Sequence, residues 1–444
     1  MKPAFIGIDI ATESTRALLV DENANVLGTA SAKLAPVIRG QDGSVTQDPQ
    51  SWVVAVASLL AEIQVIAAAA QVEPISLVIS ATSGTFTLVN GEGRALIPAA
   101  IYNDGRASSP LDRAIFIRKA EKLEGKLHLV HTPEFVIASL LNLKPQDIAA
   151  DWSHALKTGV DLNTQSWKPG ILSQANTENI SLPNVVAPGA KLGAIGKLNI
   201  HAGMTDGCTA QISAGGADLG SAVTTLGTTM VIKLVSNKDV SGPGFYSHLL
   251  PKTNWLVGGA SNLGGISFKE FASDIKSWDQ KAEAHGPASF VTYPLHSKGE
   301  RFPIANKDLA KVSSGKPINE IDNYRAILEG IAFAEKLSYE ILAKAGAPLT
   351  GELRTAGGGA KSHVWCKIRA TVLNRPVIAQ KGSGSDLGAA LIAIAAVTSP
   401  TDIAAGISAI ELPAGEIYLP VQEEVEAMAS GYKLFVKITE SPHL

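Results

Sequence analysis

Hydrophobic and polar positions along this chain predict short strands joined by tight turns, with helices between them. The first 30 residues contain two apolar runs, Phe5–Ile8 and Ala17–Val20, which are joined by a polar turn of small hydroxyl residues. A third run begins near Val26. Apolar runs of this length between turn signals are typical of strands. The opening of the chain therefore predicts a β-hairpin followed by a further strand.

A helical pattern follows from Ser51 to Ala70, and the segment ISLVIS at residues 75–80 then predicts a buried strand. This strand runs directly into ATSGT, residues 81–85, which is another turn of small hydroxyl residues. Loops at such positions commonly carry functional groups. We therefore expect this turn to contact a ligand.

The pattern of the first hairpin returns once, near the middle of the chain. Residues 219–235, LGSAVTTLGTTMVIKLV, predict a strand, a Gly-Thr-Thr turn and a second strand. A single recurrence at about half the chain length indicates paired lobes and not a solenoid, whose repeats are short. We predict a boundary after Leu219, with an N-terminal domain at residues 1–219 and a C-terminal domain at residues 220–444.

A third glycine cluster, Gly357–Gly359, follows the predicted strand ELRTA and precedes an amphipathic helix, SHVWCKIRATVLN, that ends before Pro376. A strand, a glycine turn and a helix in this order suit nucleotide binding. The last helical pattern, from Gln422 to Ile438, predicts a packing element without chemistry of its own.

Composition supports an α/β protein of two domains that binds small molecules. The 444 residues exceed what one hydrophobic core usually supports. Hydrophobic residues make up 45% and charged residues 18%, with 41 glycines, as in chains of alternating strands and helices. The formal net charge is -3 and no run of Lys or Arg occurs, which argues against nucleic acid and anionic membrane surfaces as partners.

Cysteine usage and targeting signals favour a cytoplasmic protein. Cys208 and Cys366 lie far apart without CxxC spacing, so neither a disulfide framework nor a zinc site is predicted. Asp9 and Glu13 interrupt the apolar stretch at the N-terminus, which excludes a secretory signal there. The apolar run 387–397 is too short to span a bilayer.

The turn of the first hairpin carries groups suited to a magnesium nucleotide. Small residues let main-chain N–H groups approach a phosphate closely. Asp9 adds a carboxylate for Mg²⁺, Thr12 and Thr15 add hydroxyl donors, and Arg16 adds positive charge. The same side chains can instead stabilise the hairpin through local bonds. The similar turn at residues 227–229 favours phosphate binding.

Asp206 is the candidate catalytic base. It stands between small residues in GMTDGCTAQISAGGADLGS, ahead of a short apolar helix and just upstream of the second hairpin. Phosphoryl transfer to a sugar hydroxyl needs a base near that hydroxyl, and a carboxylate can accept the proton. An aspartate before an apolar helix is also a frequent N-cap, which is the alternative interpretation.

Five segments in order resemble the FGGY carbohydrate kinases, a family that includes glycerol kinase, xylulokinase and ribulokinases. They are GIDIATESTRALLVD, MTDGCTAQISAG, TTLGTTMVI, NYRAILEGIAFA and TAGGGAKSHVWCKIRATVLNRPV. The resemblance covers nearly the whole chain. It implies two actin-like (ribonuclease H-like) ATPase domains around a central cleft, with ATP and Mg²⁺ as cofactors.

The resemblance also implies roles for individual residues. It makes Asp206 the catalytic base and Asp9 the carboxylate associated with magnesium, both facing the substrate. The implied nucleotide contacts are Thr12, Gly227, Thr228, Gly264, Gly359, Ala360 and His363. For His363 an exposed position on the helix after the glycine turn is an equal alternative.

In the same family the turn Thr82–Thr85 and the segment AIYNDGRA face the sugar. Ser83 is our preferred sugar contact, and Tyr102 and Asp104 are further candidates, because sugars need matched polar partners beside an aromatic or apolar wall. Asp104 and Arg106 can instead pair with each other and brace the loop.

Within the family, DWSHALKTGVD and YPLHSKGERFPI resemble the D-ribulokinase branch, a relative of the xylulokinases. A Gln-Met-His turn typical of xylulokinases is replaced by TSGT. We therefore expect a ketopentose, first D-ribulose, with D-xylulose, a tetritol or another polyol as alternatives, and a monomer or homodimer. Ala11 replaces the usual glycine of the first turn, which leaves a catalytically weak sugar or nucleotide sensor as a function of another class.

Overall fold

The structure is a computed structural model that describes residues 1–251 and 254–440, and these residues form two compact units. The first unit consists of residues 1–213, 248–251 and 384–412, and the second of residues 214–247, 254–383 and 413–440. The late segment 384–412 thus packs with the N-terminal part of the chain. The predicted division after Leu219 assigns this segment to the C-terminal domain, and it stays a prediction.

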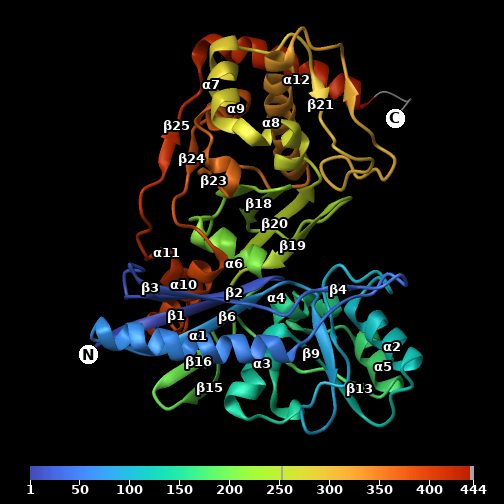
Figure 1. Cartoon of the computed structure of the whole chain (residues 1–444), viewed down its shortest axis with the longest axis vertical. Helices are drawn as coiled ribbons and strands as arrows, with labels where there is room; N and C mark the ends of the chain where they lie inside the picture. The colour runs from blue at the N-terminus through green and yellow to red at the C-terminus, as the bar shows by residue number, and fades with distance from the viewer. Residues whose placement is uncertain (252–253, 441–444) are drawn as a thin grey trace. The chain divides into compact units, whose positions relative to one another are not determined.

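The central sheet of the first unit has the strand order β15-β16-β6-β1-β2-β3. Its strands are β1 (Lys2–Ile10), β2 (Ser14–Val20), β3 (Val26–Lys33), β6 (Val72–Ala81), β15 (Lys191–Ile195) and β16 (Leu198–His201). β1, β2 and β3 are antiparallel neighbours, whereas β6 lies parallel to β1 on its other side. The predicted hairpin, the strand near Val26 and the buried strand at 75–80 are all confirmed (Figure 1).

Two helices from opposite ends of the chain cover this sheet. α1 (Gln50–Ala69) confirms the helix predicted from Ser51 and packs on β2 and β3. It is apolar and long enough to cross a membrane by length and composition, a property that core helices share. α10 (Ser385–Thr398) packs on β1 and β6. A Cβ atom at Gly7 would lie 2.0 Å from the carbonyl oxygen of Asp386, so only glycine permits this contact.

A second sheet and several short helices complete the first unit. The sheet has the order β13-β9-β7-β8-β5-β4. Its strands are β4 (Ile38–Arg39), β5 (Val45–Gln47), β7 (Phe86–Val89), β8 (Ala99–Ala100), β9 (Leu127–His131) and β13 (Ile180–Ser181). The helices are α2 (Pro110–Ala120), α3 (Thr132–Leu141), α4 (Trp152–Ala155), α5 (Pro169–Thr177), α6 (Asp206–Ser213) and α11 (Ile403–Ser408). Two small ribbons pair β10 (Ala149–Asp151) with β14 (Asn184–Val186) and β11 (Val160–Asp161) with β12 (Ser166–Trp167).

The second unit repeats the central design of the first. Its sheet has the order β19-β20-β18-β17-β23-β24-β25. The strands are β17 (Ala222–Leu226), β18 (Met230–Ser236), β19 (Phe245–Leu249), β20 (Trp255–Ser261), β23 (Leu353–Ala356), β24 (Val377–Ala379) and β25 (Glu416–Tyr418). As in the first unit, an antiparallel run of three strands (β17, β18, β20) is flanked by a strand, β23, parallel to its first member. The predicted internal duplication and the α/β class are confirmed.

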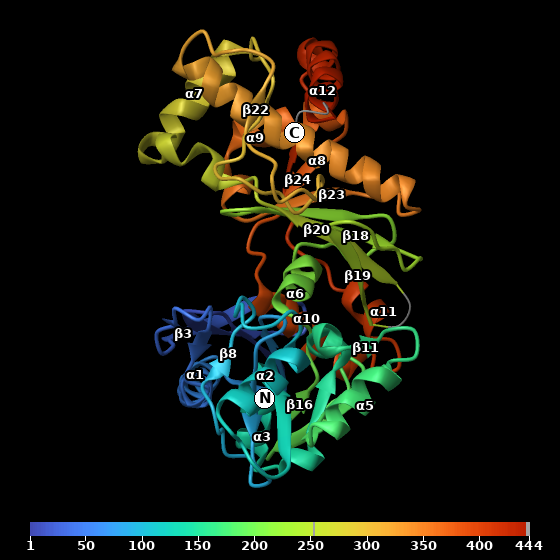
Figure 2. The same ribbon diagram turned by 90° about the vertical axis from the view of Figure 1, so that its right-hand side faces the viewer.

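Four helices lie together on one side of this sheet in both views (Figures 1 and 2). They are α7 (Ile275–His285), α8 (Glu320–Lys344), α9 (His363–Leu373) and α12 (Val425–Thr439). The predicted helix after the glycine cluster is α9. The predicted last helix is α12, which begins three residues later than predicted because Gln422–Glu424 form a 3₁₀ turn.

A buried ion pair connects α8 and α9 to the neighbouring strands β17 and β23. Arg369 on α9 donates to Glu335 on α8 at 2.6 and 2.7 Å, and both side chains are fully buried. Arg369 also donates to the Thr355 hydroxyl at 2.7 Å, and Glu335 accepts from the Thr224 hydroxyl at 2.5 Å. The pair therefore holds β17 and β23 at the points where they approach their glycine-rich turns.

Candidate active site

The first hairpin places Asp9 at the end of β1, opposite Arg16 in the β-sheet register. The Ala11 N–H donates to the carbonyl of Ser14 at 3.1 Å and closes the turn. The residues with positive φ among those described do not include Ala11, so its methyl group meets no backbone strain. The one sequence feature that favoured a weak sensor therefore loses its physical basis.

Two threonines of this hairpin have different surroundings. The Thr15 side chain is buried, and its hydroxyl donates to the carbonyl of Asp9 at 3.0 Å, so it braces the hairpin as placed. Its contact with phosphate stays a prediction. Thr12 lies in the turn and its carbonyl accepts from the Gln47 side chain at 2.8 Å, which fixes the main chain there.

Asp9 has unusual electrostatics. Its Oδ1 atom is buried and has no hydrogen-bond partner among the described residues. The pKa of Asp9 is raised to about 7, first by burial and then by the charges of Asp206 and Asp386, and this is the net result after the smaller lowering effects of Arg16 and His154. Two carboxylates from distant parts of the sequence thus disfavour the charged form of Asp9 in the first unit.

Asp386 was missed by sequence reasoning. It lies in the first turn of α10, where the Leu387 N–H donates to its Oδ1 at 2.9 Å. The sequence of α10 is mostly apolar and is typical of a helix in the protein core. Only the packing of α10 on β1 brings Asp386 near Asp9.

The carboxylates fit a divalent cation. Mg²⁺ is commonly held by one or two carboxylates, with water and phosphate oxygens as its other ligands. Throughout the described ranges, no group of three or more His, Cys, Asp or Glu residues is arranged to hold a metal. A magnesium ion near the unpartnered Oδ1 of Asp9 would therefore take most of its ligands from water and a bound nucleotide.

The raised pKa of Asp9 leads to a testable prediction about stability. The unfolded chain loses this proton near pH 3.8, but the folded chain retains it up to about pH 7. Between these pH values Asp9 must take up a proton when the chain folds, so the stability of the folded state decreases as the pH rises from 3.8 to about 7. We expect Asp9→Asn to raise Tm at pH 8 by about 2–4 °C or more, and to raise it less at pH 5.

Differential scanning fluorimetry at both pH values, with and without Mg²⁺, measures this effect. Mg²⁺ should stabilise the natural protein at pH 8 and leave Asp9→Asn unchanged. A lower Tm for the variant at pH 8 would contradict the predicted electrostatic strain.

Asp206 is the first residue of α6. The N–H groups of Cys208 and Thr209 donate to the carbonyl of Thr205 at 2.8 and 3.0 Å, so Thr205 stands in the position before the helix. The Asp206 carboxylate accepts from the Gly207 N–H at 2.6 Å, and the Ser385 hydroxyl donates to the Asp206 carbonyl at 3.1 Å. The geometry therefore does not make Asp206 the helix cap.

The structure brings most of the predicted sugar-side residues together. The Thr82 and Thr85 hydroxyls lie 2.8 Å apart, and the Tyr102 N–H donates to Thr85 at 3.1 Å. The Ser83 hydroxyl is buried, and no described group hydrogen-bonds to it. Asp104 has a different environment, because its buried carboxylate accepts from the Val45 N–H and from both Nε and Nη2 of Arg106. That geometry matches the alternative of a loop brace.

In the second unit, the Gly227–Thr229 turn is supported by a second loop. The Gly265 N–H donates to the Gly227 carbonyl at 2.9 Å, and the Ile266 N–H donates to the Thr228 carbonyl at 3.1 Å. Gly264 has φ +150°, and a Cβ atom there would lie 2.8 Å from the Thr228 carbonyl. The predicted position Gly264 thus allows the main chain to pack against the hairpin turn.

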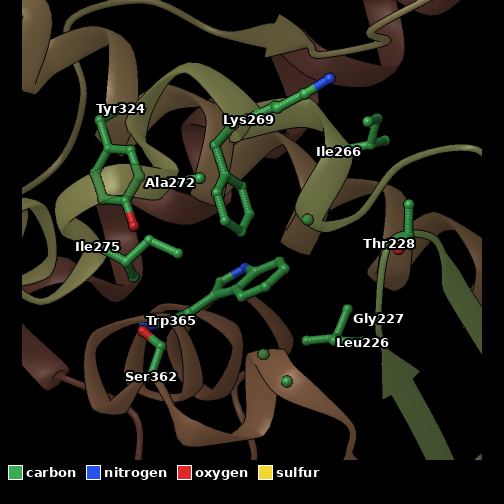
Figure 3. A pocket seen from close by; sticks show the side chains of 14 residues that line it. Leu226, Gly227, Thr228, Ile266, Lys269, Ala272, Ile275, Tyr324, Ser362 and Trp365 are labelled. Atoms are coloured by element: carbon green, nitrogen blue, oxygen red, sulfur yellow. The ribbon is translucent and has the colours of Figure 1, made fainter.

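A pocket of about 460 Å³ lies beside this turn (Figure 3). Its lining consists of Leu226, Gly227, Thr228, Gly265, Ile266, Phe268, Lys269, Ala272, Ile275, Tyr324, Gly358, Gly359, Ser362 and Trp365. Figure 3 shows Tyr324 and Ile275 on one side, Ile266 and Thr228 on the other, and Trp365 between them. Predicted residues Gly227, Thr228 and Gly359 therefore meet at a mainly apolar pocket of a size that suits a flat heterocycle.

The aromatic wall of this pocket was not identified from the sequence. Phe268 contacts the Trp365 ring edge-on, with centroids 5.3 Å apart, and the Tyr324 hydroxyl donates to Asp279 at 2.8 Å. Predicted residues Ala360 and His363 line a different hollow, of about 620 Å³. The His363 side chain is 65% exposed and its Nδ1 lies 3.0 Å from the Tyr418 hydroxyl, so it occupies the surface position given as an alternative.

Comparisons with known proteins identify the family of this chain. Residues 4–147 match the N-terminal domain and residues 222–397 the C-terminal domain of the FGGY family of carbohydrate kinases. A xylulose kinase from Bacillus subtilis is 26% identical over 436 residues, covering 87% of both chains.

Solved structures show the same fold over the whole length. The xylulose kinase from Rhodospirillum rubrum is 22% identical with a TM-score of 0.86, and a protein described as a xyloylose kinase from Brucella ovis is 20% identical with a TM-score of 0.87. Both similarities cover 99% of each chain. Each unit therefore has the predicted actin-like α/β fold.

Proposed function

We propose, from the premise that this chain belongs to the FGGY family of carbohydrate kinases, that it transfers the γ-phosphoryl group of ATP to a terminal hydroxyl of a ketopentose. The observation that carries this proposal is that one unit contains both Asp206, at the start of α6, and the buried carboxylate of Asp9, whose Oδ1 has no hydrogen-bond partner among the described residues. The first carboxylate suits a general base, and the second suits a magnesium-bound triphosphate.

The residues of each unit have separate tasks in the proposed reaction. The apolar pocket of the second unit would hold the base of ATP, and the main-chain N–H group of Thr228 would bind a phosphate oxygen. Bound Mg²⁺ would neutralise charge on the triphosphate. Asp206 would accept the proton of the sugar hydroxyl as the oxygen attacks the γ-phosphorus in line.

Two ketopentoses are candidates for the substrate. The curated relative in Bacillus subtilis is named xylulose kinase, which supports D-xylulose. The turn Thr82–Thr85 lacks the Gln-Met-His sequence typical of xylulokinases, and the segment 151–161 resembles the D-ribulokinase branch, so these two segments favour D-ribulose instead. Both sugars present the same terminal hydroxyl to Asp206, so the same mechanism serves either. We propose a cytoplasmic location for either activity.

A coupled assay of ADP release over D-ribulose, D-xylulose, L-ribulose, erythritol, glycerol and gluconate tests the proposal. We expect kcat/KM for one ketopentose to exceed that for glycerol and gluconate by at least about 100-fold, because a site built to bind sugar hydroxyls rejects ligands that leave its polar groups unpaired. ADP release that no sugar stimulates would contradict a kinase and would favour a sensor. A preference for a tetritol or gluconate would overturn only the ketopentose assignment.

Ser83 offers a direct test of the sugar side. We expect Ser83→Ala to raise the KM for the preferred sugar by about 3- to 10-fold, because it removes a hydroxyl that forms one hydrogen bond with the sugar. The KM for ATP should not change. Ser108→Ala, which removes an exposed hydroxyl hydrogen-bonded to Asp112, is the control and should leave both KM values unchanged. An unchanged sugar KM in Ser83→Ala would place the sugar elsewhere.

A further inference from the structure

The first unit contains two buried histidine–carboxylate pairs that the proposed function does not yet use. His131 pairs with Glu134 at the start of α3, and His154 pairs with Asp151 at the start of α4. The Nδ1–carboxylate distance is 2.6 Å in each pair, and both histidines are almost fully buried. The pairs have the same spacing in sequence but different partners on the other ring nitrogen.

His154 is surrounded by acceptors. Asp151 Oδ1 accepts from the N–H groups of Ser153 and His154 at 2.9 Å and so caps α4, while Asp151 Oδ2 faces His154 Nδ1. On the other side of the ring, Nε2 lies 3.3 Å from the carbonyl oxygen of Ala81 at the end of β6. A carboxylate and a carbonyl can only accept, so both ring nitrogens must donate, and only the imidazolium ion does this.

His131 does not have this requirement. Its Nε2 lies 2.8 Å from the hydroxyl of Thr158, which can donate or accept. A neutral His131 therefore satisfies both contacts. This difference makes His131 a matched control for His154.

The His154 ring faces several negative charges and the helix of the proposed base. Burial opposes its charged form, but the carboxylates of Asp151, Glu134 and Asp206 together raise the pKa of His154. The charge of His154 in turn lowers the pKa of Asp9. The positive charge of His154 therefore interacts with the carboxylates of both Asp9 and Asp206.

Hydrogen bonds also fasten α4 to the residue before Asp206. The hydroxyl of Ser153 lies 3.1 Å from that of Thr205 and accepts from the Thr205 N–H at 3.2 Å. Ala81, which His154 contacts, forms a parallel bridge with Thr205. The start of α6 is therefore connected to α4 through both the side chain of Ser153 and the end of β6.

We propose that His154 is a positioning residue for phosphoryl transfer: held as an imidazolium ion by Asp151 and the Ala81 carbonyl, it supplies a fixed positive charge that keeps Asp206 ionised. The inference rests on the proposed role of Asp206 as the base. A buried cation near a carboxylate favours the ionised form of the carboxylate, and a base must be ionised to accept a proton. No proton needs to leave or reach His154 during the reaction.

The test compares pH profiles of kcat for the natural protein, His154→Gln and Asp151→Asn. His154→Gln removes the charge but retains a donor, and Asp151→Asn retains an N-cap residue but removes the carboxylate that stabilises the imidazolium ion. We expect the acid limb of the profile to move up by about 1 pH unit in both variants, with kcat on the plateau within about 3-fold of the natural value. A purely structural role would lower kcat equally at all pH values and leave the acid limb in place.

His131→Gln is the matched control, because it removes an equally buried paired histidine. We expect it to lower Tm and to leave the acid limb where it is. An acid limb that moves equally in His131→Gln, or that stays in place in both test variants, would overturn the proposal.

NMR of the histidine rings gives a readout that does not depend on activity. With the nine histidines ¹⁵N-labelled, the signal that disappears in His154→Gln identifies His154. We expect the ring to be an imidazolium ion in the natural protein at pH 7.5, where an ordinary histidine is mostly neutral, and a neutral ring in Asp151→Asn. A neutral His154 in the natural protein would contradict the inference even if the protein is an active kinase, whereas absent sugar-dependent turnover would contradict the proposed function alone.

Discussion

Asp206→Asn is expected to lower kcat for sugar phosphorylation by about 10²- to 10⁴-fold, the range that general-base catalysis commonly contributes. The amide is nearly isosteric with the carboxylate but does not accept a proton at neutral pH. The start of α6 should persist, because Thr205 and not Asp206 provides the carbonyl before the helix. ATP binding, measured by calorimetry, should remain within about 3-fold of the natural value, since the apolar pocket lies in the second unit.

Asp386→Asn is the matched control for this variant. Like Asp206, Asp386 stands in the first turn of a helix, accepts an N–H from the next residue and raises the pKa of Asp9. We expect it to lower kcat by less than about 10-fold, because we assign no proton transfer to it. An equal loss of kcat in both variants would mean that the local negative charge matters and that Asp206 has no distinct role. Near-normal turnover in Asp206→Asn would exclude Asp206 as the base.

Arg369→Leu is expected to produce the largest loss of stability, about 3–5 kcal/mol, because it leaves the Glu335 carboxylate buried without its cation. The Thr355 hydroxyl also loses a donor. The double variant Arg369→Leu, Glu335→Leu should lose less than Arg369→Leu alone, since replacing both charges removes the unpaired carboxylate. Urea unfolding monitored by circular dichroism measures these differences.

Lys367→Ala provides the comparison on the same helix. Lys367 pairs with Glu283 at 2.6 Å, but both side chains are about half exposed. Exposed pairs of this kind contribute about 0–1 kcal/mol. A loss in Lys367→Ala as large as that in Arg369→Leu would show that α9 tolerates no substitution in general and that burial of the Arg369–Glu335 pair is not the cause of the loss.

Much of the local structure follows from the order of residues along the chain. Both hairpins and the helices after Ser51 and Ser362 were predictable, because apolar periodicity and turn residues act over a few positions. Their recurrence also predicted two similar domains, and the five ordered segments predicted the family.

Long-range packing decided other features. The segment 384–412 belongs to the first unit because α10 lies against Gly7 and covers β1, a contact between residues almost 400 positions apart that local patterns do not encode. The same packing brings Asp386 toward Asp9. The apolar wall around Trp365 also gathers from separate segments.

Neighbouring residues and motifs in order were enough to predict the secondary structure around the two hairpins, the duplicated α/β plan and the family. The surroundings of individual polar groups became known from the folded chain alone: the unpartnered Oδ1 of Asp9, the hydrogen bonds that Asp104 accepts, and the two acceptors that face the His154 ring. The physical reason is that burial and hydrogen-bond partners depend on which distant segments pack together, and these set the charge that a side chain carries.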